Sequence, residues 1–130
     1  MPKLSVWTIR LALLHFMAGW SVGAALLASR GGLALPAFSW LTLHQFTLLF
    51  GWIMQLAFGV AYWMLPTFGR ERRRRGFAIG AVVLVNASVV AAALGPVWDG
   101  APIGAFGGLA LGALSFAWHA WPRIKEFGAA

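Results

Sequence analysis

Long runs of apolar residues, broken by short stretches rich in glycine, proline or arginine, form the main pattern of this chain. A hydrocarbon core of about 30 Å requires about 20 apolar residues in a helix. Four segments meet this requirement, and we predict membrane-spanning helices at residues 6–29, 38–66, 77–94 and 103–121. The stretches SRGGLALP, TFGRERRRRG and GPVWDGAP between them have the composition of turns. The pattern predicts an all-α integral membrane four-helix bundle with a single transmembrane domain, residues 1–130.

Composition supports a location in the membrane. The chain is 61% hydrophobic and 10% charged, whereas a soluble domain carries about a quarter of charged residues. The net charge of +7 does not indicate nucleic-acid binding, because the basic residues lie at the ends of apolar segments, as membrane anchors do. The absence of cysteine excludes disulfides and thiolate metal sites.

The distribution of basic residues predicts the orientation in the membrane. With four spans, both termini lie on one side. That side carries nine of the ten basic residues, namely Lys3, Arg10, Arg70, Arg72, Arg73, Arg74, Arg75, Arg123 and Lys125. Only Arg30 lies on the other side, so the positive-inside rule places both termini in the cytoplasm. The arginine cluster at 70–75 fixes this topology and contacts anionic lipids, or else it docks an acidic partner.

The second apolar segment carries a stripe of polar residues and glycines. At 100° per residue, the members of this stripe all fall within about 60° of His44: Gly51, Gln55, Gly59 and Tyr62. Polar groups in hydrocarbon normally face a bundle interior or a cavity. Two interpretations remain open. Either the stripe packs against another helix, or His44 ligates haem iron and the glycines make room for the porphyrin.

The segment HQFTLLFGWIMQLAFGVAYWMLP resembles the second helix of the catalytic subunit of haem–copper oxidases and the related nitric oxide reductases. The resemblance covers residues 41–66. It implies that His44 is an axial ligand of a low-spin haem, that Gly59 is the small residue before the exit, and that Pro66 is the exit proline. In that family the histidine lies near the outer surface, which is also where the charge distribution places His44.

This sequence departs from the family in size, because the family subunit has many more helices than four. Its second axial ligand and its copper ligands come from later helices, so we expect no copper and no catalysis by this chain alone. The resemblance implies a small subunit that binds b-type haem through His44, for electron transfer or for gas or redox sensing. It would belong to a respiratory system in the cytoplasmic membrane of a bacterium or archaeon.

Two other functions stay open. One is a haem-free accessory or assembly subunit of an oxidase or nitric oxide reductase. The other is a small transporter or channel. Proton-coupled carriers usually have an acidic residue inside the membrane, whereas Glu71, Asp99 and Glu126 all lie in predicted turns or tails.

The source of a second haem ligand is open. His15 and His44 differ in predicted depth by roughly 8 Å, which makes a bis-histidine site within one chain difficult. A homodimer would bring two copies of His44 to one depth. A partner subunit or an open iron position are further options. His15 is also a candidate for a polar pocket or a quinone headgroup site, and we expect His119 at the inner interface.

Small residues at every fourth position predict close helix contacts elsewhere. In the fourth segment these are Gly104, Gly108 and Gly112. Gly19 and Gly23 repeat the spacing in the first segment.

Overall fold

The computed structural model describes residues 1–32, 37–66, 74–95, 98 and 100–124. Its elements are α1 (Lys3–Arg30), α2 (Ala37–Gln45), the π-helix η1 (Phe46–Met54), α3 (Gln55–Met64), α4 (Arg75–Ala93), α5 (Ala101–Ala120) and the 3₁₀ turn η2 (Trp121–Arg123). Several residues discussed above lie outside the described part: Arg70, Glu71, Arg72, Arg73, Asp99, Lys125 and Glu126.

Four helices are long and apolar enough to cross a membrane: Lys3–Arg30, Trp40–Met64, Arg75–Ala93 and Ala101–Arg123. The second of them is a continuous helix formed by α2, η1 and α3. The described residues contain no strand. The predicted all-α class and the four membrane-length helices are therefore confirmed.

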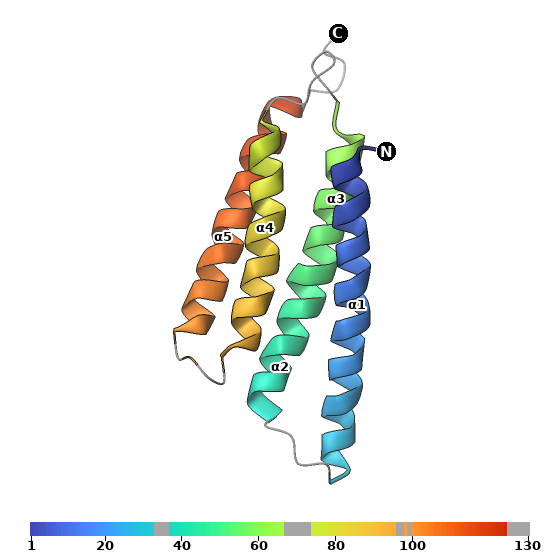
Figure 1. Cartoon of the computed structure of the whole chain (residues 1–130), viewed down its shortest axis with the longest axis vertical. Coiled ribbons are helices and arrows are strands. Elements are labelled where there is room, and N and C mark those ends of the chain that lie inside the picture. The colour runs from blue at the N-terminus through green and yellow to red at the C-terminus, as the bar shows by residue number, and fades with distance from the viewer. Residues whose placement is uncertain (33–36, 67–73, 96–97, 99, 125–130) are drawn as a thin grey trace.

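The helices form two antiparallel pairs (Figure 1). In the first pair, α1 packs along α2, η1 and α3, and in the second pair α4 packs along α5. Contacts from α4 to the second helix join the two pairs. The start of α1 and the end of α5 lie at one end of the molecule (Figure 1). That this end faces the cytoplasm stays a prediction from the distribution of charge.

Small residues bring α4 and α5 close together. A Cβ atom on Gly108 would collide with Oγ of Ser88, and one on Gly112 would lie 3.3 Å from the carbonyl oxygen of Ala81. Close packing at these two glycines is as predicted. Gly104 differs, because a Cβ there would meet no described atom within 4 Å.

Aromatic rings fill the space where the two pairs meet. Phe46 of η1 packs against Val85 of α4 and Leu109 of α5. Nearer the other end, the rings of Phe58 and Phe116 stack with centroids 4.0 Å apart. Many large apolar side chains point outward instead, such as Ile103, which is 79% exposed. This arrangement suits a chain surrounded by lipid, since lipid solvates such side chains.

Candidate functional site: the histidine contacts between α1 and the second helix

His44 joins the second helix to α1 through a hydrogen bond and a close ring contact. Its Nδ1 lies 2.8 Å from the carbonyl oxygen of Gly19. Its ring lies against Gly23, where an added Cβ would be 2.7 Å from the ring carbon Cε1. A larger residue at position 23 would therefore displace the imidazole.

His15 makes the corresponding contact in the opposite direction, from α1 to the second helix. A Cβ on Gly51 would lie 2.6 Å from Cγ of His15. Nδ1 of His15 lies 2.9 Å from the carbonyl oxygen of Leu11 in its own helix. Each helix thus presents a histidine ring to a glycine of the other, and these two reciprocal contacts fix how closely the helices approach.

The hydrogen bond of His44 determines its tautomer. A carbonyl oxygen can only accept a hydrogen bond, so Nδ1 of His44 donates to Gly19 and carries the proton. In the neutral ring, Nε2 then has a lone pair. Histidines that ligate metals typically have this arrangement, in which the second ring nitrogen donates to a carbonyl or carboxylate and fixes the ring.

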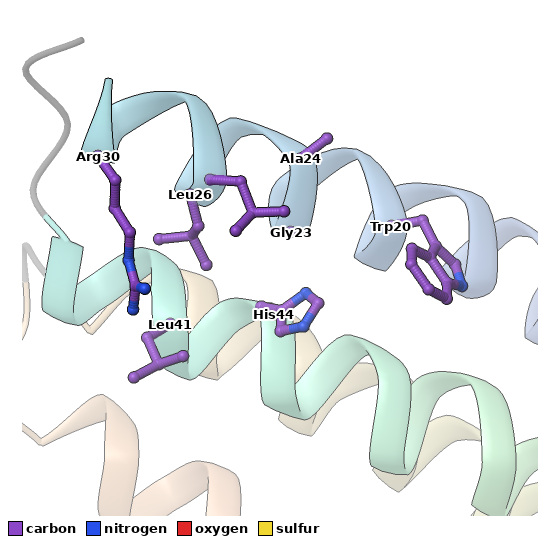
Figure 2. A pocket seen from close by; sticks show the side chains of 8 residues that line it. Trp20, Gly23, Ala24, Leu26, Arg30, Leu41 and His44 are labelled. Atoms are coloured by element: carbon purple, nitrogen blue, oxygen red, sulfur yellow. The ribbon is translucent and has the colours of Figure 1, made fainter. Parts of the chain in front are cut away.

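A pocket of about 430 Å³ lies beside His44, between α1 and α2 (Figure 2). Arg30 and Leu26 extend from α1 toward α2, and His44 points from α2 toward α1 (Figure 2). The lining is otherwise apolar or small: Trp20, Gly23, Ala24, Leu26, Leu27 and Leu41. The pocket therefore combines an imidazole, a guanidinium group and apolar walls, which suits a largely apolar ligand with an anionic end.

The other members of the predicted stripe take different positions. Gln55 is completely buried, and its Nε2 donates to the carbonyl oxygen of Thr8 in α1 at 3.4 Å. Its Oε1 accepts a hydrogen bond from Nδ2 of Asn86 in α4 at 2.8 Å. A Cβ on Gly59 would lie 2.9 Å from Cγ1 of Ile9. Side chains of α1 thus lie directly against Gly51 and Gly59, and these glycines do not line the pocket.

Tyr62, the last member of the stripe, contacts α5. Its ring stacks on that of His119, with centroids 5.2 Å apart and planes at 18°. The rest of the stripe contacts α1 on both sides of the π-helix η1, because Gly51 lies against His15 and Gly59, beyond η1, lies against Ile9.

His15 does not line the pocket beside His44. It lies against Gly51, which is seven residues from His44 and hence at most about 10 Å along the helix. Both histidines belong to the same helix pair, yet the structure does not bring their rings to one pocket. Within the described residues, no group of three or more His, Cys, Asp or Glu side chains is placed to hold a metal ion.

The end of the bundle where α1 begins and α5 ends holds a second group of polar contacts. His119 is completely buried, and its Nδ1 lies 2.9 Å from the carbonyl oxygen of Arg74. Arg74 donates from Nη1 to the carbonyl oxygen of Trp118 at 3.1 Å. Its guanidinium carbon lies 4.7 Å from the centre of the Trp118 ring. That His119 lies at the depth of the inner interface stays a prediction; the structure shows that its side chain is buried and ties α5 to the start of α4.

Searches against protein-family models, curated proteins and solved structures find no match to this chain. The resemblance of residues 41–66 to haem–copper oxidases therefore stays a prediction from the sequence.

Proposed function

We propose that this chain is a small integral membrane protein that binds b-type haem in the pocket between α1 and α2, with Nε2 of His44 as an iron ligand. One observation carries the proposal. Nδ1 of His44 donates to the Gly19 carbonyl, which holds the ring in place and, in the neutral ring, leaves the lone pair on Nε2, as in metal-ligating histidines.

The pocket suits haem in its chemistry. Haem is a flat apolar ring with two anionic propionate groups. Trp20, Leu26 and Leu41 offer apolar surface, and Arg30 offers a positive charge on the same pocket. When bound, haem supplies one-electron transfer or gas binding. In this proposal Gly23 is the residue that allows the imidazole to lie close to α1, and Gly51 and Gly59 serve helix packing.

We place this function in a respiratory system of a bacterial or archaeal cytoplasmic membrane, with both termini inside. The distribution of charge and the resemblance of residues 41–66 support this assignment. Because His15 does not line the pocket, a sixth iron ligand would come from a second copy or a partner subunit. Otherwise that position stays open for a gas.

The test is the visible spectrum of protein purified from haem-replete cells. We expect a Soret band and a pyridine haemochromogen spectrum of b type. The variant His44→Ala should lose the haem, whereas His119→Ala should retain it. His15→Ala is the matched control from the same helix pair, because His15 also packs on a glycine but lies off the pocket; it too should retain haem.

The spectrum also reports the number of ligands. Two imidazoles give sharp low-spin bands in the reduced protein, and one imidazole gives a high-spin spectrum that shifts with carbon monoxide. Absence of a Soret band in the wild-type protein, both alone and bound to its partner, would contradict the proposal. The haem-free accessory subunit would then be the better assignment.

A further inference from the structure

A groove on the exposed side of α4 and α5 lies far from the pocket of His44, near the end of the bundle where α1 begins and α5 ends. It is a shallow, open groove of about 320 Å³, lined by Arg74, Gly76, Phe77, Gly80 and Ser115. A Cβ atom on Gly76 or Gly80 would meet none of the described atoms within 4 Å. The two glycines thus leave a notch on the surface that the rest of the described protein does not fill.

Positive charge lies at one end of this groove. Arg74 and Arg75 are both exposed. The guanidinium group of Arg74 is held in place, because it lies over the ring of Trp118 and donates one hydrogen bond to the Trp118 carbonyl. A guanidinium group has five N–H donors. Arg74 therefore presents a fixed charge with further donors to a ligand beside α4.

The hydroxyl group of Ser115 lies farther along the groove. Serine and threonine in helices often donate to a carbonyl one turn back, and Ser21 and Ser88 do so here. Among the described residues, Ser115 makes no such bond. Gly80 lies six residues beyond Arg74, about 9 Å farther along α4. The groove thus has a charged end at Arg74, the hydroxyl group of Ser115 farther along, and an apolar notch at Gly80.

We propose that this groove binds an anionic membrane phospholipid. The phosphate would contact Arg74 and Arg75, an ester group of the glycerol backbone would accept a hydrogen bond from Ser115, and an acyl chain would lie on Gly76 and Gly80. Phosphate is a preferred partner of arginine. Anionic lipids also attract basic residues at the cytoplasmic face, which is the side that we predict for this end.

Charge favours a lipid over a second copy of the chain in this groove. Glycines four residues apart, like Gly76 and Gly80, also occur where transmembrane helices dimerise. A parallel dimer through these glycines would bring Arg74 and Arg75 of both copies to one depth, where like charges repel. An anionic headgroup would neutralise the same charges. An anionic lipid is therefore the occupant to which the surface is complementary.

The experiment measures binding of phosphatidylglycerol and phosphatidylcholine to the full-length protein by native mass spectrometry after detergent exchange. We expect retained adducts with phosphatidylglycerol and weak ones with phosphatidylcholine. Gly80→Leu should fold, because a Cβ there meets no described atom within 4 Å, and it should lose phosphatidylglycerol binding, because its side chain would fill the notch. Arg74→Gln should weaken the binding of phosphatidylglycerol by about fivefold, the usual contribution of one basic residue near an anionic surface. Arg74→Lys should keep most of the preference for phosphatidylglycerol over phosphatidylcholine.

Two controls match these variants. Gly104→Leu places the same side chain at another open glycine, on α5, and Arg10→Gln removes an exposed charge from α1, in the other helix pair. Both should bind phosphatidylglycerol like the wild type. Equal binding of the two lipids, or equal phosphatidylglycerol binding by Gly80→Leu and Gly104→Leu, would overturn the proposal. So would a dimer that Gly80→Leu abolishes while lipid binding stays unchanged, since the groove would then be an interface between copies.

Discussion

The hydrogen bond between Gln55 and Asn86 predicts an asymmetric effect of mutations on stability. Asn86 donates from Nδ2 to Oε1 of Gln55 at 2.8 Å, and Nδ2 also donates to the carbonyl oxygen of Val82 at 2.7 Å. The variant Asn86→Leu leaves Oε1 of a completely buried Gln55 without this donor. The variant Gln55→Met leaves Asn86 with its bond to Val82. Replacing Asn86 should therefore destabilise the protein more than replacing Gln55.

The magnitude follows from the environment. A buried polar group that loses its partner costs about 1–3 kcal/mol in a soluble protein. In membranes, hydrogen bonds between helices average about 0.6 kcal/mol and reach about 1.7 kcal/mol, because the unfolded chain also finds partners there. We expect Asn86→Leu to lower the free energy of unfolding by about 0.6–1.7 kcal/mol in the wild-type background. In the Gln55→Met background, the same replacement should be nearly neutral.

The assay is a double-mutant cycle, with reversible unfolding of the four proteins in mixed micelles or bicelles. Ser21→Ala is a suitable control, because Ser21 is exposed and bonds only within α1, to the carbonyl oxygen of Met17. Its effect should stay within about 0.5 kcal/mol. If Asn86→Leu has the same effect in both backgrounds, within about 0.3–0.5 kcal/mol, the two side chains are not coupled and the reasoning is refuted.

Two further predictions concern packing and orientation. Gly108→Leu should destabilise the protein by about 1–3 kcal/mol in detergent melts, because even a Cβ there collides with Ser88. Gly104→Leu, one helical turn away at an open position, should have little effect; equal melting temperatures for the two would show that Gly108 does not pack as described. The chain has no cysteine, so single cysteines introduced at positions 69 and 99 report orientation. An impermeant maleimide added to cells should label position 99 and leave position 69 unlabelled, and the reverse pattern would invert the predicted topology.

Features that depend on local composition could be predicted from the sequence. The number of helices follows from the length of the apolar runs, and close packing at Gly108 and Gly112 follows from the spacing of small residues. The same spacing could not show that Gly104 is open. Whether a glycine meets a neighbour depends on which face of its helix the partner covers: Ala101 and Ala105 are completely buried, whereas Gly104 lies beside that face.

The candidate site was predicted in part. The sequence indicates His44 and its stripe, but it does not show that Tyr62, at the end of the stripe, stacks on His119 of α5. The π-helix could not be predicted either, because its nine residues, Phe46–Met54, have no pattern that distinguishes i+5 from i+4 bonding. That Gly23 and Arg30 line the pocket of His44 depends on the pairing of α1 with α2, which the pattern within one helix does not show. Burial of His119 likewise depends on a long-range contact with Arg74, at the start of another helix.

The pairing of the helices has a consequence for how the protein is made. Every residue that lines the pocket of His44 belongs to α1 or α2, and both reciprocal histidine–glycine contacts lie within the same first pair. As the chain leaves the ribosome, this hairpin enters the membrane before α4 and α5 have been synthesised. We therefore expect the pocket to be complete on the nascent chain, so that a ligand can be loaded during synthesis. The later arrival of Asn86 would then lock an already occupied hairpin to the second one through Gln55.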